Sequence, residues 1–460
     1  MIDEKSISSL KGLVDSAGTD YAEIRISEID KTIFSLRGDS VETVSSGISL
    51  AGSVRIFDRG NWTFLSFNSI EEVQNHLLRA KELSMKLPAQ KKELKKQSKP
   101  VSIRKKSSPV IDFAEITPEQ KFALCNEYNN ILKGSPRIQT TRTMYRDAKS
   151  RDIYVNSEGS DMYYEKLHCG VSLSAIAKEG NEIQTYQESF AGYGGFELVN
   201  NRHAEAEKVI AVALELLEAQ PIEGGKYSVI TDPRLTGVFI HEAFGHLSEA
   251  DFVYENNRMK KLMTLGKVFG PQFLNVVDDG SIEDAVGYIP LDDEGVEPRK
   301  NYLIKNGELC GRLHSRETAG LMNEELTGNA RAISAMAQPI VRMTNTYIEN
   351  GKNTKDELFE EIGDGVYAVN AFGGQTNLEM FTFSSAYGRI IKDGKPGKMV
   401  KNVMLSGNVF DTLKNVRMAA NDMQLFGGLG GCGKGGQGPL PVSFGGPHLL
   451  IDNVLIGGNQ

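Results

Sequence analysis

A short helix that carries two histidines is the sequence feature that most constrains this chain. It lies in Thr231–Asp251, which reads TDPRLTGVFIHEAFGHLSEAD. Asp232 can cap a helix and Pro233 suits its first turn, so a helix is predicted to start here. An apolar stretch then leads to His241, and His246 follows five positions later. Any fold for this chain must therefore fix the relative position of the two imidazoles.

The spacing of the two histidines constrains the backbone between them. Five positions of a straight α-helix turn the chain through about 500°, which leaves the imidazoles about 140° apart. A π-bulge would return positions i and i+5 to one face, and such bulges are frequent at functional sites. Gly245 offers backbone freedom for this distortion. The motif predicts a metal site on a π-distorted helix; the alternative is two buried histidines that are close by chance.

Glu242 follows the first histidine in the His-Glu-x-x-x-His pattern, which is one residue longer than the His-Glu-x-x-His motif of many zinc proteases. We expect Glu242 to act as a general base toward a water molecule activated by the metal. The spacing leaves the third ligand open among Glu249, Asp251, His314 and Cys432. Two histidines plus one cysteine or carboxylate, with a free fourth position, is a catalytic zinc arrangement.

Cys432 lies in a glycine-rich loop, Phe426–Pro441, with the sequence FGGLGGCGKGGQGPLP. Glycine lets a backbone approach a ligand closely, and Lys434 can favour the thiolate that zinc binds. The alternative is a surface linker of small residues, although linkers rarely contain cysteine. Gly428–Lys434 fits part of a phosphate-binding loop, but neither Ser or Thr nor a helix follows, so nucleotide binding is not expected.

The hydrophobic periodicity predicts an α+β fold, in which an N-terminal mixed α/β region precedes a β-rich C-terminal domain that carries the metal-binding helix. The expected helices include 6–14, 118–132 and 203–217, and another begins near Ser69. We expect four segments: an N-terminal α+β domain at 1–87, a basic linker at 88–108, a central α+β domain at 109–222 and the C-terminal domain at 223–460.

Charge and composition argue against several classes of function. Residues 88–108 are basic, but no aromatic residues are interleaved and the whole chain has a formal net charge of −8. A solvated linker is therefore favoured over a nucleic-acid or membrane patch. The first residues lack the basic region of a signal peptide, and no window approaches the about 18 apolar residues of a membrane span. We predict a cytoplasmic protein without nucleic-acid or membrane partners.

The remaining cysteines, Cys125, Cys169 and Cys310, are far apart and form no CxxC pair. They are expected to be small packing residues in a reducing compartment.

At the histidine helix and the cysteine loop, the sequence resembles the TldD/PmbA family, and specifically its TldD branch. HEAFGHLSEAD and GGCGKGGQ carry the specific likeness. Weaker family-like pieces extend over nearly the whole chain: Gly52–Phe57, Tyr154–Ser160, Asp292–Pro298, Thr327–Ala332, Arg342–Gly351 and Ser406–Val416.

The resemblance implies a zinc metalloprotease whose Zn²⁺ is bound by His241, His246 and Cys432, with Glu242 as the catalytic base and 223–460 as the metalloprotease domain. It implies a peptide substrate, either small and unfolded or a precursor to be trimmed. It also implies a dimer, formed either by two identical chains or with a TldE/PmbA-like subunit that lacks the metal motif.

Three further points remain open. Arg331, Arg342 and Lys434 are possible substrate-binding residues, because fixed cations can stabilise an oxyanion or hold a peptide C-terminus; ordinary ion-pair arginines are the alternative. Asp292–Glu294 is either a turn or a support for the site. The alternative function is a catalytically silent scaffold subunit that binds a peptide or a partner.

Overall fold

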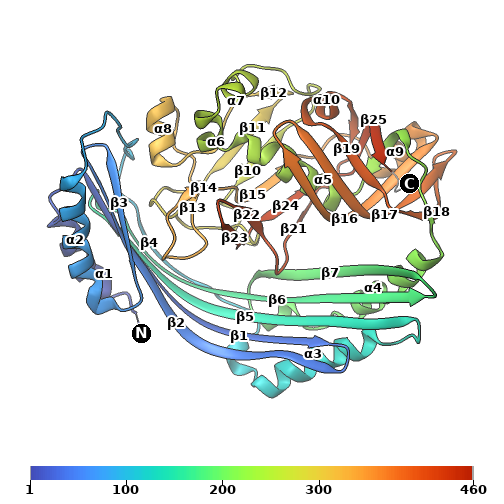
Figure 1. Ribbon diagram of the computed structural model, residues 1–460, viewed down its shortest axis with the longest axis horizontal. Coiled ribbons are helices and arrows are strands. Elements are labelled where there is room, and N and C mark those ends of the chain that lie inside the picture. Colours follow the sequence, from blue (N-terminus) through green and yellow to red (C-terminus); the bar gives the residue numbers. More distant parts are fainter. Residues whose placement is uncertain (1, 458–460) are drawn as a thin grey trace.

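Four very long strands dominate the N-terminal half of the chain. The computed structural model describes residues 2–457. The long strands are β1 (Tyr21–Arg37), β2 (Ser40–Asp58), β5 (Ile138–Asn156) and β6 (Asp161–Glu179). Each would span about 60 Å at roughly 3.3 Å per residue. Figure 1 shows them as one strongly curved sheet beneath the C-terminal domain.

This sheet joins the two segments that were expected to form separate domains. Its order is β3-β2-β1-β5-β6-β4, with β7 also paired to β6. The additional strands are β3 (Asn61–Phe67), β4 (Ser102–Lys106) and β7 (Glu182–Tyr193). Antiparallel pairing of β1 with β5 connects the first segment to the second along fifteen residue pairs.

The expected linker at 88–108 is wrong for residues 102–106, which form β4. This strand pairs in parallel with β6, because an open edge of the sheet offers backbone groups to which a polar segment can bind. Earlier in the same stretch, Lys92 pairs with Glu317 of the C-terminal domain at 2.8 Å. The basic stretch is therefore held against both parts of the molecule.

Helices cover one face of the curved sheet. They are α1 (Ser6–Asp15), α2 (Val73–Lys86), α3 (Pro118–Leu132) and α4 (His203–Glu218), with short 3₁₀ turns η1 (Ile70–Glu72), η2 (Phe113–Glu115) and η3 (Phe196–Leu198). Two apolar clusters form there, one under α1 and α2 and one under α3 and α4. Since side chains alternate along a strand, the residues between them point to the opposite, concave face.

The C-terminal domain is rich in strands, as predicted. One sheet has the order β12-β11-β10-β15-β24-β21, and the other β16-β9-β25-β19-β17-β18-β8, with β20 paired to β25. A pairing of β16 with β17 closes part of the second sheet on itself. The bounds of the first sheet are β10 (Val276–Asp279), β11 (Lys300–Lys305), β12 (Glu308–Leu309), β15 (Asn345–Ile348), β21 (Gln424–Phe426) and β24 (Ser443–Gly446).

The bounds of the second sheet are β8 (Gln220–Pro221), β9 (Gly225–Thr231), β16 (Gly365–Asn377), β17 (Met380–Lys392), β18 (Lys395–Lys401), β19 (Met404–Asn408), β20 (Val416–Ala419) and β25 (Leu449–Gly457). Two ribbons complete the strands: β13 (Ala330–Arg331) with β14 (Ile340–Val341), and β22 (Cys432–Lys434) with β23 (Gln437–Leu440). The helices are α5 (Pro233–Ile240), α6 (Ala250–Glu255), α7 (Asn257–Leu262), α8 (Arg316–Met322), α9 (Lys355–Ile362) and α10 (Val409–Lys414).

Helix α5 packs between the two sheets of the C-terminal domain and contacts β15, β21 and β24 on one side and β16 on the other. Leu235, Phe239 and Ile240 are buried in the main apolar cluster of the domain. At Gly237 the helix approaches β24 so closely that a Cβ atom would lie 2.4 Å from the backbone nitrogen of Gly445. This packing fixes the end of α5, where the histidines lie.

A buried ion-pair network joins the curved sheet to the C-terminal domain. Arg55 of β2 is 2% exposed and contacts Glu23 of β1 and Glu294 of the C-terminal domain, each at 2.7 Å. Arg316 of α8 is fully buried and pairs with Glu158, which follows β5, at 2.6 Å. Among residues 2–457, no helix has both the length and the apolar character needed to cross a membrane.

Candidate metal centre

The helix that carries the histidines starts as the sequence predicts. The Asp232 carboxylate accepts a hydrogen bond from the backbone N–H of Leu235 at 2.8 Å, and Pro233 occupies the first turn. After α5 the chain continues as a π-helix, η4 (His241–Gly245), and a 3₁₀ turn, η5 (His246–Ser248). The predicted π-distortion is confirmed.

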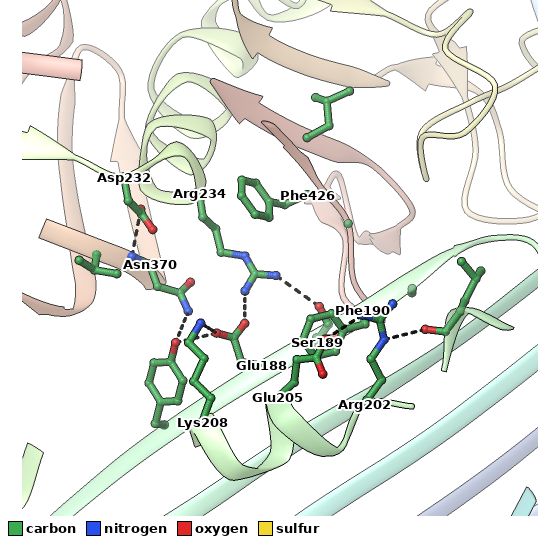
Figure 2. Close-up of a pocket in the computed structure, with 16 residues that line it drawn as sticks. Glu188, Ser189, Phe190, Arg202, Glu205, Lys208, Asp232, Arg234, Asn370 and Phe426 are labelled. Carbon is green, nitrogen blue, oxygen red and sulfur yellow. Dashed lines mark hydrogen bonds and ion pairs between the residues drawn. The ribbon is translucent and has the colours of Figure 1, made fainter. Parts of the chain in front are cut away.

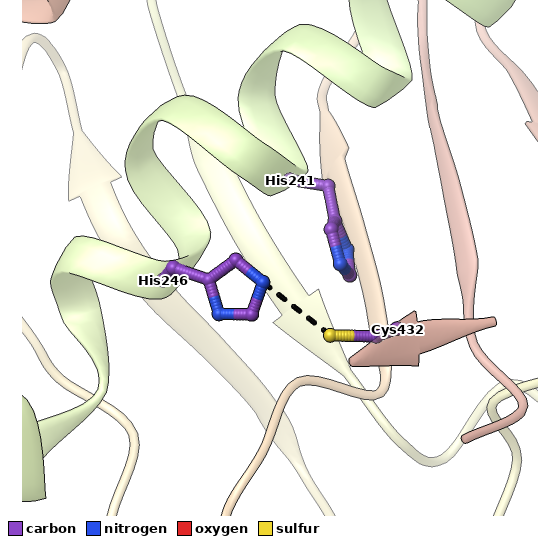
Figure 3. A group of neighbouring side chains, drawn as sticks. All are labelled: His241, His246 and Cys432. Carbon is purple, nitrogen blue, oxygen red and sulfur yellow. Dashed lines mark hydrogen bonds between the residues drawn. The ribbon is translucent and has the colours of Figure 1, made fainter. Parts of the chain in front are cut away.

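The distorted helix brings both imidazoles to one side, and Cys432 lies opposite them (Figure 3). The nitrogen and sulfur atoms that the three residues offer lie within 4.8 Å of one another. The Cys432 Sγ is 3.4 Å from the His246 Nε2, and the imidazole centroids are 5.4 Å apart. Of the four side chains considered as third ligand, Cys432 belongs to this group.

The chemistry of this group fits a thiophilic cation. Burial would raise the pKa of the Cys432 thiol, but the hydrogen bonds and charges of His241 and His246 lower it to about 5, which favours the thiolate. The Nδ1 of His241 is buried and has no hydrogen-bond partner among the described residues. A thiolate beside two imidazoles, one with an unsatisfied nitrogen, is a suitable donor set for a metal ion.

Glu249 contacts His246 of this group, and Lys434 contacts Glu249 in turn. The Glu249 carboxylate contacts the Nδ1 of His246 at 3.0 Å, which leaves Nε2 to face the sulfur. Lys434 Nζ lies 3.1 Å from Glu249 and 2.7 Å from Asp251, and donates to the Val341 carbonyl at 2.8 Å. Carboxylates that bond to a ligating histidine fix its orientation and tautomer.

Gly245 is required for a different reason from the one that the sequence suggested. Its φ of −56° and ψ of −52° are helical, so no special backbone freedom is used. A Cβ atom at this position would instead lie 2.1 Å from the sulfur of the buried Met343. Close packing under the π-helix, not backbone freedom, requires glycine.

The two predicted arginines contact the cysteine loop. Arg342 is fully buried and donates to the carbonyl oxygens of Cys432, at 2.7 Å, and Gln437, at 3.1 Å. Arg331 donates to the carbonyls of Met343, at 2.6 Å, and Pro441, at 2.8 Å. The described hydrogen bonds of these guanidinium groups thus go to protein carbonyls.

A cleft of about 210 Å³ opens on His241 and Cys432 and is called the metal cleft here. His241, Glu242 and Cys432 line it together with side chains of α5, β7 and β16: Gln187, Ser189, Arg234, Val238, Asn370 and Ala371. The Glu242 carboxylate is one-third exposed and lies 3.8 Å from the His246 Nε2. It is the acidic side chain among those that line the cleft.

A further cavity, of about 340 Å³, shares Ser189, Arg234 and Asn370 with the metal cleft. Figure 2 shows Arg234 reaching from α5 to Glu188 of the curved sheet. Glu188 also accepts from Tyr186 at 2.6 Å. The sequence patterns did not single out these residues. Arg234 could have been identified, because a residue seven positions before His241 lies on the same helix face. Ser189 and Asn370 could not, because the sequence around them contains no motif.

Other predicted residues lie outside the group. His314 is buried and contacts Thr318 and Glu324, so it is not a ligand here. Asp292 is also buried and caps a turn by accepting backbone N–H groups, in agreement with one of its two interpretations. Cys125 and Cys169 are buried in the sheet core, whereas Cys310 is exposed, contrary to the expectation of packing.

Known protein families and relatives match nearly the whole chain. Residues 224–458 match the PmbA/TldA metallopeptidase C-terminal domain, 111–218 the central domain and 22–86 domain 1. A metalloprotease of Synechocystis sp. is 41% identical over 443 residues, which cover 96% of this chain and 95% of the relative. A protein of Saccharolobus solfataricus named zinc metalloprotease TldD homolog is 28% identical, over 96% and 98% of the two chains.

The fold is found in a solved structure as well. The crystal structure of TldE from Thermococcus kodakarensis superposes with a TM-score of 0.79, at 17% identity over 99% of each chain. The matched domains cover most of the chain, and the first relative is similar along nearly its whole length. The chain therefore belongs to the TldD/PmbA family of metallopeptidases.

Proposed function

We propose that this chain is a zinc-dependent peptidase that cleaves small or unfolded peptides, including peptide precursors. The observation that carries the proposal is the convergence of His241, His246 and Cys432 within 4.8 Å beside the Glu242 carboxylate. Its relatives named metalloprotease, and one named zinc metalloprotease, support the same reading.

Zinc suits this donor set better than other common cations. Thiolate and imidazole ligands favour Zn²⁺ over Mg²⁺ or Ca²⁺, which prefer oxygen. Three protein ligands leave a fourth position for water or substrate, as in catalytic zinc sites. When bound, zinc would act as a Lewis acid toward a water molecule and a peptide carbonyl. A thiolate ligand must stay reduced, so we infer a reducing compartment such as the cytoplasm.

Glu242 would move the proton in this reaction. Its carboxylate faces the metal cleft and is adjacent to the ligand atoms, so it can take a proton from the attacking water and pass it to the leaving amine. Glu249 would hold His246 in place. Burial raises the pKa of its carboxyl, but the charges and hydrogen bonds of His246 and Lys434 lower it below its ordinary value. Residues from β7 and β16 would line the path of the peptide.

We assign Arg331, Arg342 and Lys434 to positioning of the cysteine loop. Arg342 holds the carbonyl of Cys432 itself, and Lys434 ties the same ribbon to Glu249. These contacts would keep the sulfur in place before a metal binds, which lowers the cost of assembling the site.

Glu242→Gln tests this function. This variant should bind as much zinc as the wild type, because the carboxylate is not among the three ligands. Its kcat on fluorogenic peptides should fall by about 10²–10⁴-fold, since a general base is removed. The measurements are zinc content by plasma mass spectrometry and hydrolysis rates before and after chelation. Chelation should abolish wild-type activity, and added zinc should restore it.

Undiminished hydrolysis by Glu242→Gln, or a fully active wild type without zinc, would refute the proposed function. A wild type that binds zinc but cleaves no peptide, alone or with a TldE-like subunit, would favour the silent scaffold. We propose pairing with such a subunit or with a second copy. Support comes from the family resemblance and from the TldE structure that shares this fold.

A further inference from the structure

A larger cavity, of about 480 Å³, lies between the curved sheet and the C-terminal domain. We call it the interdomain cavity. Its floor is the concave face of the sheet, to which β1, β5 and β6 contribute alternate side chains. Its roof consists of residues 288–293, 331–335 and 439–441. The proposed chemistry at the metal does not use this space.

The interdomain cavity is basic in an acidic protein. Its lining includes five cationic side chains and three carboxylates, a formal excess of two positive charges. The whole chain carries −8. The cations are Arg25, Lys31, Arg146, Lys166 and Arg331, and the carboxylates are Asp152, Asp292 and Asp293. A concave site with a net charge of one sign concentrates ligands of the other sign.

Three of these cations have no carboxylate partner. Asp293 pairs with Arg25, and Asp152 pairs with Lys166, each at 3.1 Å. The oxygens of Asp292 accept backbone N–H groups instead. Among residues 2–457, no ion pair within 4.0 Å is found for Lys31, Arg146 or Arg331, and Arg331 is already committed to backbone carbonyls.

Arg146 is the partly buried cation whose charge is least compensated. Its Nη2 donates to the carbonyl of Leu429 at 3.3 Å, and burial lowers its pKa. On the neighbouring strand, the Nε2 of the buried His168 has no hydrogen-bond partner among the described residues. Burial, followed by the charges of Arg146 and Lys166, lowers the His168 pKa to about 3, so this imidazole is neutral. An anion near Arg146 would offset the cost of holding its charge out of water.

One ribbon of chain separates this cavity from the metal cleft. Leu440 lines the interdomain cavity and pairs with Cys432 across the β22–β23 ribbon. Directly opposite residues in such a pair have Cα atoms about 4.5–5.5 Å apart. Leu429, whose carbonyl Arg146 holds, stands between Gly428 and Gly430, which line the metal cleft. The two spaces therefore lie on either side of the same loop.

We propose that the interdomain cavity binds a carboxylate of the peptide substrate, with Arg146 and Lys31 as the cations that recognise it. This inference rests on the proposed peptidase function and gives it a substrate class, namely peptides with negative charge a few residues from the cleaved bond. The carboxylate can be the C-terminus of the peptide or an Asp or Glu side chain. Guanidinium and ammonium groups form charge-assisted hydrogen bonds to either.

Binding of defined peptides tests the proposal. The probe is a fluorescein-labelled alanine-rich peptide of about eight residues with two glutamates near its free C-terminus, and anisotropy reports its Kd for the Glu242→Gln protein. In one arm the glutamates become glutamines, and in another the C-terminus is amidated. At least one neutralised peptide should bind about tenfold more weakly, as expected for loss of a charged hydrogen bond. The arm that weakens binding identifies which carboxylate is recognised.

Two variants locate the site. Lys31→Gln removes an exposed side chain without a described contact, and Arg146→Gln removes the half-buried cation. Each should weaken binding of the acidic peptide more than that of the neutral peptide. Zinc content, which Lys31→Gln should leave unchanged, shows whether the lost contact with Leu429 in Arg146→Gln also disturbs the cysteine loop. The matched control is Arg142→Gln on the same strand, which removes the same charge outside the cavity from an arginine that pairs with Glu42.

Equal affinity for acidic and neutral peptides would overturn the proposal. It would also be overturned if Arg142→Gln lost the preference for the acidic peptide while Lys31→Gln and Arg146→Gln kept it. In hydrolysis by the otherwise wild-type protein, both cavity variants should raise KM for the acidic peptide and leave kcat within about twofold. The binding assay needs no turnover. A chain that cleaved nothing would refute the peptidase function, and the anion site would still be judged on affinity.

Discussion

At the scale of single residues, the site depends on a sulfur whose role a local pattern does not reveal. The His-Glu-x-x-x-His spacing predicts two ligands and a base, but it leaves four candidates for the third position. Cys432 could be chosen in advance only through the family resemblance, because its contact with His246 joins positions 186 residues apart in sequence. The contact by which Glu249 orients His246 could not be predicted either, because it depends on how η5 turns.

Cys432→Ser should lose zinc. A neutral hydroxyl is a far poorer zinc ligand than a thiolate, so the Kd for zinc should rise more than about 100-fold. Competition with a chromogenic chelator measures this change. Cys310→Ser is the matched control, because that thiol is exposed and lies outside the group of three. A serine variant with wild-type affinity would remove Cys432 from the ligand set.

At the scale of elements, the π-helix η4 places the histidines, and its packing on Met343 decides which residue can precede His246. The spacing of five could be interpreted correctly because it is a matter of helix geometry alone. The need for Gly245 could not, since it arises from a side chain about a hundred residues further along the chain.

Gly245→Ala should disturb the site through overpacking. The new Cβ would overlap the Met343 sulfur, so either Met343 or the π-helix must shift, at a cost of about 1–3 kcal/mol. We expect lower thermal stability and weaker zinc binding, followed by calorimetry and chelator competition. The double variant Gly245→Ala/Met343→Ala should recover zinc affinity, because the overlap is removed. If the double variant bound zinc no better than Gly245→Ala, the packing explanation would fail.

Many helices and strands of the fold could be predicted, but the sheet that they form could not. Helix α3 spans the predicted residues, and α4 extends one residue beyond them. Tyr21–Glu28 and Lys31–Arg37 each alternate like a separate strand in the sequence, but they form the single strand β1 because no turn separates them. The pairing of β1 with β5 joins residues more than a hundred positions apart, and alternation of side chains says which face is buried but not which strand is the neighbour.

At the scale of the whole molecule, buried charges hold the curved sheet and the C-terminal domain in one arrangement. Arg55 links β1, β2 and Glu294, and Arg316 links α8 to Glu158. The metal cleft and the interdomain cavity are both lined by residues of the two halves, so their shapes depend on this junction.

Arg55→Ala should destabilise the molecule by about 3–5 kcal/mol, because Glu23 and Glu294 would remain buried without their partner. Urea denaturation followed by fluorescence of Trp62, which packs against Arg55, would report the change. Lys392→Ala is the control, since its ion pair with Asp364 is exposed and should leave the midpoint unchanged. Equal midpoints for the two variants would contradict a stabilising role of the junction.

The separation of the proposed metal ligands along the chain has a consequence for synthesis. At about 5–20 residues per second, a ribosome needs roughly 10–40 s to pass from His246 to Cys432. During that time the histidine helix can exist, but the sulfur that completes the proposed zinc site does not. A chain whose translation stops before Cys432 would therefore contain both histidines and the Glu242 carboxylate but lack the third of the proposed zinc ligands.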